Sequence, residues 1–284
     1  MPRLLNIACL QVQPKGEIGL ALDEALALAE VAADNGAKLL TLPEYCGGLR
    51  TRNGAIIPPS APEETHAMLQ GLRDFATSRR VWIAIGSIAV PAGDGKVFNR
   101  GFVIDPAGNI ISRYDKIHMF DIQLSDFEVY KESTHVCEGS QAVVTDTPFG
   151  QLGHSICYDL RFPHLYRNLA KAGAEILLVP AAFTKKTGEA HWHILNRARA
   201  IENGAFVVAA CSVGEIEGGG ECFGHSLIVD PWGEVLADGG PDPGITQTII
   251  DLDQVKKIRM KIPSLEHDRP YAGAGAGAAR RKVA

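Results

Sequence analysis

The sequence predicts an α/β protein whose mixed β-sheets are covered by helices, and three observations lead to this fold class. Strand patterns alternate with helix patterns through the first half of the chain. Some strand candidates, such as Leu5–Gln11 and Glu175–Pro180, are apolar at nearly every position, which is typical of strands buried on both faces. Hairpin patterns, such as Ser226–Asp230 with Glu234–Ala237, follow without intervening helices. Mixed sheets packed under helices satisfy all three observations.

The predicted helices are recognised by apolar periodicity and by their stop signals. Ile18–Ala33 is dense in Ala and Leu, carries acidic residues on one side, and is followed by Gly36 as a C-cap. Pro163 suits the first position of a helix, and Gly204 is a stop signal. The predicted helices are Ile18–Ala33, Glu63–Arg80, Leu165–Ala172, Gly188–Asn203 and Gln254–Lys261.

The predicted strands are short apolar runs bounded by Gly, Pro, Asn or Asp. They are Leu5–Gln11, Lys38–Pro43, Val81–Val90, Val97–Asp105, Ile110–Tyr114, Ala142–Thr145, Leu152–Ile156, Glu175–Pro180, Phe206–Ser212, Ser226–Asp230, Glu234–Ala237 and Thr246–Leu252. We expect Cys46–Ser60 to be a loop over the strand ends and Glu215–Glu221 to be a Gly-rich turn. His118–Glu138 is aromatic, charged and irregular, which is the composition of an ordered active-site loop.

Composition and charge exclude several classes of function. The chain has 284 residues, of which 46% are hydrophobic, and a net charge of −5. A nucleic-acid-binding protein needs a basic face, which this charge argues against. No apolar run approaches the ~18–20 residues of a membrane span, and the N-terminus lacks the apolar core of a signal peptide. We therefore expect neither nucleic acid nor membrane as a partner.

Domain organisation and compartment follow from the same reading. No composition break divides the chain, so we expect one domain over residues 1–271. The Ala-Gly repeats that follow predict a low-complexity C-terminal tail over residues 272–284. The six cysteines, at positions 9, 46, 137, 157, 211 and 222, contain no C-x-x-C pair. They favour free thiols in a reducing cytoplasm.

The stretch from Leu152 to Pro163 is the centre of the functional prediction. It begins as an apolar strand and turns polar at Cys157, just before the helix that Pro163 opens. Ligands bind at the carboxyl ends of strands in open α/β sheets, and a nearby helix N-terminus favours the nucleophilic thiolate. The alternative is that Cys157 is a small buried hydrophobe. A serine nucleophile at Ser155 lacks the last Gly of G-x-S-x-G.

Two further strand ends carry reactive side chains. Glu44 follows the strand at Lys38–Leu42, and Lys116 follows the strand at Asn109–Tyr114. Taken alone, either residue could be a charged side chain in solvent at the end of a strand. Lys116 could also form a surface ion pair with Asp115. Three strand ends that deliver Glu, Lys and Cys predict that these side chains meet at one edge of a sheet.

The chain resembles the nitrilase superfamily of carbon–nitrogen hydrolases in several stretches between about Asn6 and Tyr271. CYDLRFP and GEAHWHILNRARAIEN resemble the Nit branch, whose members are amidases that act on deaminated glutathione or on ω-amides of α-keto acids. The matching stretches are LPE at Leu42–Glu44, YDKIHMFD at Tyr114–Asp121, YKES at Tyr130–Ser133, CYDLRFP at Cys157–Pro163, GEAHWHILNRARAIEN at Gly188–Asn203 and GHSLIVDPWGEVLA at Gly224–Ala237.

The resemblance implies a four-layer α/β/β/α sandwich of two six-stranded sheets that packs into at least a homodimer. It also implies cofactor-independent hydrolysis of a small, carboxylate-bearing linear amide. A nitrilase or an N-carbamoyl amidase with the same three residues is the alternative. A non-catalytic member that uses the fold as an interaction surface is disfavoured, because all reactive positions are filled. No nucleotide-binding glycine motif is present, so no nucleotide cofactor is expected.

The chemistry of an amide assigns a role to each residue. Cys157 attacks and forms a thioester acyl-enzyme that releases ammonia. Glu44 is the general base, a role for which we expect burial to raise its pKa. Lys116 stabilises the oxyanion together with the backbone N–H of Tyr158, and its charge favours the Cys157 thiolate. The YKES match places a second carboxylate beside this triad at Glu132.

Substrate recognition is predicted at four positions, namely Tyr158, Arg161, Phe183 and Thr187. Arg161 either holds a substrate carboxylate bidentately or braces the site through Asp159 or Glu132. Phe183 and Thr187 match pocket positions of the Nit branch. No metal site is predicted, because His191 and His193 lie two residues apart on a helix and point apart. His193 stands where that branch more often has Glu, so its role is left open.

Overall fold

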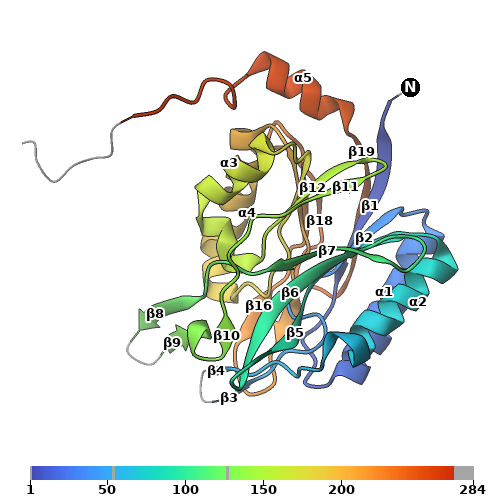
Figure 1. Cartoon of the computed structure of the whole chain (residues 1–284), viewed down its shortest axis with the longest axis vertical. Helices are drawn as coiled ribbons and strands as arrows, with labels where there is room; N and C mark the ends of the chain where they lie inside the picture. The colour runs from blue at the N-terminus through green and yellow to red at the C-terminus, as the bar shows by residue number, and fades with distance from the viewer. Residues whose placement is uncertain (1, 53–54, 126–127, 272–284) are drawn as a thin grey trace, which may run out of the picture.

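The computed structural model describes residues 2–52, 55–125 and 128–271. Two mixed sheets lie face to face between two layers of helices, as Figure 1 shows. The predicted four-layer sandwich is therefore confirmed. The predicted tail, residues 272–284, lies outside the described residues. Among the described helices, none combines the length and apolar character needed to cross a membrane.

The first sheet is built around two parallel pairs in its centre. β1 (Leu4–Gln11) pairs in parallel with β2 (Leu39–Thr41), which pairs in parallel with β5 (Trp82–Gly93). Antiparallel strands extend both sides of this centre. They are β19 (Gly244–Asp251) beside β1, β6 (Lys96–Ile104) beside β5 and β7 (Ile110–Asp115) beside β6. With β10 (Val136–Cys137) in parallel on β6, this sheet has seven strands within the described ranges instead of the six that the resemblance implied.

The second sheet has the same plan with six described strands. Its parallel centre is β12 (Gly150–His154), β13 (Ile176–Leu178) and β14 (Phe206–Ala209). Antiparallel neighbours complete it, namely β11 (Val144–Thr147), β17 (Leu227–Val229) and β18 (Val235–Asp238). These bounds agree with the predicted strands to within a few residues.

The helices cover the outer face of each sheet. α1 (Ile18–Asp34) and α2 (Ala67–Arg79) pack on the first sheet, whereas α3 (Pro163–Lys171) and α4 (Lys185–Asn203) pack on the second. α5 (Asp253–Lys261) follows β19. The predicted helix at Glu63–Arg80 is divided, because His66 is extended (ψ 109°) between a 3₁₀ turn at Glu63–Thr65 and α2.

Side-chain alternation along the strands separates three apolar cores. In β1, Ala8 and Leu10 face α1 and α2, whereas Ile7 and Cys9 face the second sheet. The third core lies between the second sheet and α3 with α4. Because both faces of each sheet are buried, its central strands are mainly apolar, which is the pattern that made them recognisable.

Three short hairpins lie in segments where the sequence predicted loops or a turn. They are β3–β4 (Thr51–Arg52 with Ala55–Ile56), β8–β9 (Asp121–Ser125 with Glu128–Lys131) and β15–β16 (Val213–Glu215 with Glu221–Phe223). The loop predictions for Cys46–Ser60 and His118–Glu138 missed the first two hairpins because their strands are only two to five residues long. The predicted Gly-rich turn at Glu215–Glu221 is the connection between β15 and β16. All three contribute residues to one pocket.

A glycine allows the two sheets to meet closely at the pocket end. A Cβ on Gly86 in β5 would lie 2.2 Å from the carbonyl oxygen of Leu42 and 2.4 Å from the side chain of Pro180. Pro180 follows β13 of the second sheet. The absence of a side chain at Gly86 therefore lets the segments after β2 and β13 approach each other.

Candidate active site

The predicted Glu, Lys and Cys come together, but from two sheets instead of one edge of a single sheet. Glu44 and Lys116 follow β2 and β7 of the first sheet, whereas Cys157 follows β12 of the second. All three line the same pocket. The sequence could not distinguish these arrangements, because it does not reveal which strands share a sheet.

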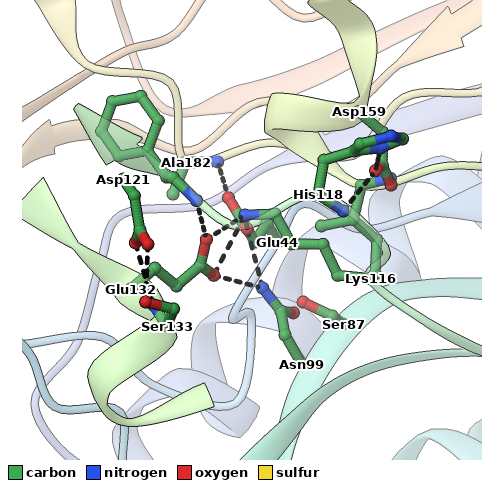
Figure 2. Close-up of polar contacts among 12 residues, drawn as sticks. Glu44, Ser87, Asn99, Lys116, His118, Asp121, Glu132, Ser133, Asp159 and Ala182 are labelled. Carbon is green, nitrogen blue, oxygen red and sulfur yellow. Dashed lines mark hydrogen bonds and ion pairs between the residues drawn. The ribbon is translucent and has the colours of Figure 1, made fainter. Parts of the chain in front are cut away.

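Lys116 lies between two carboxylates, as Figure 2 shows. Its ammonium Nζ lies 2.8 Å from Glu44 Oε1 and 2.8 Å from Glu132 Oε2. The three side chains are at most 3% exposed. An ammonium between two carboxylates in a buried site satisfies charges that would otherwise be costly to remove from water.

Neighbouring groups fix both carboxylates. Asn99 donates from its amide Nδ2 to Glu44 Oε1 at 2.8 Å and to Glu132 Oε1 at 3.3 Å. The backbone N–H of Ala182 donates to the other oxygen of Glu44 at 3.0 Å. Glu132 also accepts from the Tyr45 hydroxyl at 3.2 Å and from the Phe120 N–H at 2.7 Å. Both carboxylates are therefore held in single orientations.

The charges of this group hold Glu44 ionised. Burial raises the pKa of Glu44, but the charge of Lys116 and the hydrogen bonds from Lys116 and Ala182 outweigh it, so the net pKa is lowered. Burial lowers the pKa of Lys116, but the charges of Glu132 and Glu44 raise it well above its usual value. The expectation of a raised Glu44 pKa was therefore wrong, because burial is not the deciding influence there.

Cys157 occupies a strained turn at the start of a 3₁₀ segment, Cys157–Arg161. Its φ is 49°, a left-handed conformation that is uncommon for a residue with a side chain. Its N–H donates to the Pro180 carbonyl at 2.8 Å. Cys157 and Glu44 line the same pocket, and Glu44 is among the groups that raise the pKa of the thiol. The turn thus places Cys157 in the pocket of the buried carboxylate.

Asp159 stabilises this turn. Its carboxylate accepts from the N–H of Ile156 at 2.8 Å and from the Tyr114 hydroxyl at 2.7 Å. It also contacts His118 Nδ1 at 2.6 Å and accepts the His118 N–H at 3.0 Å. The stretches around Tyr114 and Cys157, which come from different sheets, are linked through this single carboxylate. Figure 2 shows its contacts with His118.

The Cys157 thiol stays protonated in the free protein. Burial and the charge of Glu44 raise its pKa well above 9.0, and the opposing influence of Lys116 is smaller. The expected influence of Lys116 is present, because its charge lowers the pKa of the thiol, but burial and Glu44 outweigh it. α3 begins only at Pro163, six residues after Cys157.

The pocket over Cys157 is lined mainly by uncharged side chains from both sheets and from the three hairpins. Tyr158, Phe183 and Thr187, which the sequence assigned to substrate binding, line it. So do apolar and aromatic groups that the sequence did not single out: Tyr45, Leu49, Ile56, Phe120, Tyr130 and Ile216. Glu221 at the rim is paired with Lys185 at 2.8 Å.

Arg161 lies behind the pocket wall. Its guanidinium carbon is 5.8 Å from the centre of the Tyr158 ring and 5.5 Å from that of Phe183, both of which line the pocket. Its Nη2 lies 3.3 Å from Nδ1 of His191. Within the described residues it pairs with neither Asp159 nor Glu132, so the bracing role through those carboxylates is not seen.

The sequence analysis gave no role in the buried polar network to Tyr45 or Asn99, and it considered Asp159 only as a partner of Arg161. Asn99 lies within a strand-like run and is fully buried, so an amide inside an otherwise mostly apolar strand was the available signal. Tyr45 follows Glu44 directly and has a φ of 51°. Asp159 lies within the CYDLRFP stretch. Their hydrogen bonds join residues that are far apart in the sequence, so the pattern of neighbouring residues does not reveal them.

His191 and His193 do not meet, in agreement with their helical spacing. His191 contacts Arg161, whereas Nε2 of His193 lies 2.9 Å from Oδ2 of Asp238. His193 lies instead with His225 and Asp238, outside the pocket.

Comparison with known proteins places nearly the whole chain in one family. The carbon–nitrogen hydrolase family model matches residues 6–260. A deaminated glutathione amidase from Synechocystis sp. is 39% identical over 264 residues, which cover 92% of this chain and 96% of the relative. The omega-amidase NIT2 of Homo sapiens is 34% identical over 266 residues, covering 93% and 95% of the two chains.

A solved structure connects the fold with a reactive cysteine. The amidase from Nesterenkonia sp. AN1 is 25% identical, with a TM-score of 0.76 and coverage of 93% of this chain and 94% of that chain. In the structure of a variant of that amidase, the acetamide moiety of fluoroacetamide is covalently added at the active-site cysteine.

Proposed function

The chain belongs to the carbon–nitrogen hydrolase family, and from this premise we propose that it hydrolyses small, carboxylate-bearing linear amides through a Cys157 thioester. The protein is thus an enzyme of the nitrilase superfamily. The observation that carries the proposal is the buried Glu44–Lys116–Glu132 group beside the Cys157 thiol, at the base of one pocket. The named activities of the two amidase relatives support a small amide as the substrate class.

Acylation begins at the Cys157 thiol. As Sγ bonds to the amide carbon, its proton passes to the Glu44 carboxylate, which lines the same pocket. The protonated Glu44 then gives this proton to the leaving nitrogen, the C–N bond breaks, and ammonia departs from a thioester. Water attacks the thioester, Glu44 accepts its proton, and the thiol is regenerated with release of a carboxylic acid. No cofactor takes part in these steps.

The developing oxyanion requires hydrogen-bond donors near Cys157. Lys116 lines the pocket and carries three N–H groups, and its contacts to Glu44 and Glu132 keep it charged. The N–H of Tyr158 has no acceptor within the described residues, so it is available as a second donor. Loss of one such donor typically costs about 2.7–4 kcal/mol of transition-state stabilisation. Glu132 acts as a positioning residue for Lys116.

The pocket walls provide the substrate contacts. Tyr158, Phe183 and Thr187 surround the space above the thiol. Arg161, stacked against the rings of Tyr158 and Phe183, supplies a positive charge for the substrate carboxylate. Because Lys116 is already paired with two carboxylates, it is not the group that binds the substrate carboxylate.

The test is a comparison of substrates by the products that they release. Deaminated glutathione, an α-keto ω-amide and simple aliphatic amides are incubated with the full chain, and ammonia and acid are measured. We expect ammonia and the corresponding acid in equal amounts, with preference for the carboxylate-bearing amides. Exclusive turnover of nitriles, or release of carbon dioxide with ammonia from carbamoyl compounds, would replace this proposal with the alternative members of the family.

Assembly, domain extent and compartment belong to the same proposal. We infer one domain over residues 1–271, since the central apolar core is shared by both sheets. A homodimer or higher oligomer is supported by exposed apolar side chains on the helical layer of α4, including Ile194 and Ile201. The six unpaired cysteines support a cytoplasmic location.

A further inference from the structure

A cluster of metal-binding side chains lies outside the catalytic pocket. His193 on α4, His225 before β17 and Asp238 at the end of β18 offer ligand atoms that all lie within 4.8 Å of one another. None of the three lines the pocket over Cys157. They come from three separate elements, so only the folded chain brings them together.

The two imidazoles face one carboxylate. Nε2 of His193 lies 2.9 Å from Oδ2 of Asp238, and Nδ1 of His225 lies 2.9 Å from Oδ1. The His193 and His225 rings lie 5.3 Å apart between their centres. The side chains are 26–36% exposed, so an ion reaches them from solvent without opening the fold.

The backbone around His225 is held in an unusual conformation. Its φ is 51°, a left-handed value that costs free energy for a residue with a side chain. Both of its backbone polar groups are tied: its N–H donates to the Gly240 carbonyl at 2.8 Å, and its carbonyl accepts from Trp192 Nε1 at 2.7 Å. The buried Trp192 directly precedes His193, so the same contact fixes both imidazoles relative to each other.

We propose that His193, His225 and Asp238 form a binding site for one divalent first-row transition-metal ion, of the class of Zn²⁺ or Co²⁺. Two imidazoles and a carboxylate form a nitrogen-rich ligand set that suits these ions, whereas Mg²⁺ and Ca²⁺ prefer oxygen ligands. With three protein ligands, the remaining positions are open to water.

Binding requires only small adjustments. Ligand atoms ~2.1 Å from a tetrahedral zinc ion lie ~3.4 Å apart. The ligand atoms here lie within 4.8 Å of one another and the two imidazole–carboxylate contacts are 2.9 Å long, so shifts of about an ångström in the ligand–ligand distances suffice. Coordination needs a lone pair on Nε2 of His193 and Nδ1 of His225, so a proton on either of these nitrogens moves to the other ring nitrogen or to solvent. The ion replaces the hydrogen bonds to Asp238 with coordinate bonds.

An ion at this place would join α4 to the β17–β18 hairpin. α4 also carries Thr187 of the pocket wall, and Gly188 lies against Phe223, where a Cβ would come 2.3 Å from the ring. Phe223 stacks on His225 with ring centres 4.6 Å apart, and its N–H donates to the carbonyl of Phe183. The expected consequence of occupancy is therefore a more stable fold, with α4 fixed beside the pocket.

The test is titration of the tag-free, full-length Cys157→Ala protein with Co²⁺ and with Zn²⁺, followed by calorimetry and, for cobalt, by absorption. Removal of the active-site thiol excludes its contribution. We expect one ion per chain, a cobalt spectrum without thiolate charge transfer, and no comparable binding of Mg²⁺. His193→Gln and His225→Gln should each weaken binding at least about tenfold, as losses at metal sites do.

His191→Gln is the matched control, since it removes an exposed imidazole from the same helix and should leave the affinity unchanged. Thermal unfolding gives the second measurement: Zn²⁺ should raise the Tm of the parent and of His191→Gln but not that of His193→Gln. Because the His193 side chain is partly exposed, its variant is expected to fold even if His225→Gln does not. Absence of saturable binding, or equal affinity in the parent and in His193→Gln, would overturn the proposal.

Discussion

Lys116 Nζ lies 2.8 Å from Glu44 Oε1, and both side chains are almost completely buried. This pair, together with Glu132, leaves a carboxylate ionised beside a protonated thiol. In the proposed mechanism, the nucleophile is produced when Glu44 takes the thiol proton during attack. This arrangement protects the sulfur at rest, because a buried neutral thiol is less reactive than a thiolate.

The pH dependence of kcat/KM should show a broad plateau. Activity falls at low pH when Glu44 becomes protonated, and because its pKa is lowered, this fall should lie below its usual value of 4.5. Activity falls at high pH when Lys116 or Cys157 loses its proton, and because both pKa values are raised, that fall should lie above pH 9.0.

A neutral amide substrate removes substrate ionisation from this profile, and circular dichroism checks folding at each pH. An enzyme pKa between about 6 and 7 in the kcat/KM profile would contradict an ionised Glu44 and a protonated thiol in the free protein.

Replacement of the nucleophile should abolish turnover without unfolding the chain. Cys157→Ser is expected to lose nearly all activity, because a hydroxyl is a much weaker nucleophile here, while its melting temperature stays close to the parent value. In the parent protein, hydroxylamine should intercept the thioester and give a hydroxamate. Mass spectrometry of the quenched reaction detects the acylated peptide.

Cys137→Ser is the control, since Cys137 is a partly exposed free cysteine outside the pocket. It should keep full activity. Turnover by Cys157→Ser at the parent rate, or acylation of another cysteine, would rule out Cys157 as the nucleophile.

Removal of the buried ammonium should destabilise the fold. Lys116→Met leaves Glu44 and Glu132 buried without a cation, and loss of one partner of a buried ion pair costs about 3–5 kcal/mol. Urea denaturation should show this decrease in the free energy of unfolding, together with loss of activity.

Adding Glu132→Gln to Lys116→Met removes one uncompensated charge and should restore part of the stability but none of the activity. Lys185→Met, which breaks the exposed pair with Glu221, is the comparison and should change stability little. Equal effects of the exposed and the buried lysine would show that burial of the pair is not important for stability.

The role of Arg161 is separated from the chemistry by comparing two substrate classes. Arg161→Lys keeps the charge but loses the planar fork that binds a carboxylate bidentately. We expect kcat/KM to fall at least about tenfold on carboxylate-bearing amides, within the range for hydrogen bonds to charged groups, and to change little on neutral amides.

The measurement is kcat/KM on both classes of amide for the parent and for Arg161→Lys. Arg197→Lys, on α4, is the control. If both classes lose activity equally and the melting temperature also falls, Arg161 supports the pocket wall and does not bind substrate.

The oligomeric state should depend on the outer face of α4. Ile194 is 68% exposed and Ile201 is 51% exposed, and Trp232 near Ile201 is 59% exposed. Light scattering should give at least a dimer for the parent, and Ile194→Asp with Ile201→Asp should shift it towards the monomer. Leu20→Asp on α1, which is comparably exposed on the opposite layer, should not. A monomeric parent at micromolar concentration would contradict this.

Much of the molecule is determined by local sequence. Strands buried on both faces must be apolar throughout, so β1, β13 and β14 were evident from composition alone. Helix ends were equally local, since Gly204 takes the left-handed conformation that ends α4. Reactive residues that directly follow strands, as Glu44, Lys116 and Cys157 do, were identifiable because strand ends are where α/β proteins bind ligands.

Tertiary structure alone decided how those residues behave. The sequence placed Glu44, Lys116 and Cys157 at strand ends, but not on two different sheets. It predicted the wrong sign for the shift of the Glu44 pKa, and it did not reveal that burial and Glu44 outweigh Lys116 at the thiol. A pKa depends on charges within a few ångströms, and Lys116, Asn99 and the Ala182 amide reach Glu44 from distant parts of the chain. The two histidines of α4 show the same division between local sequence and tertiary structure. Helical spacing alone predicted that His191 and His193 point apart, whereas only the fold brings His193 to His225 and Asp238.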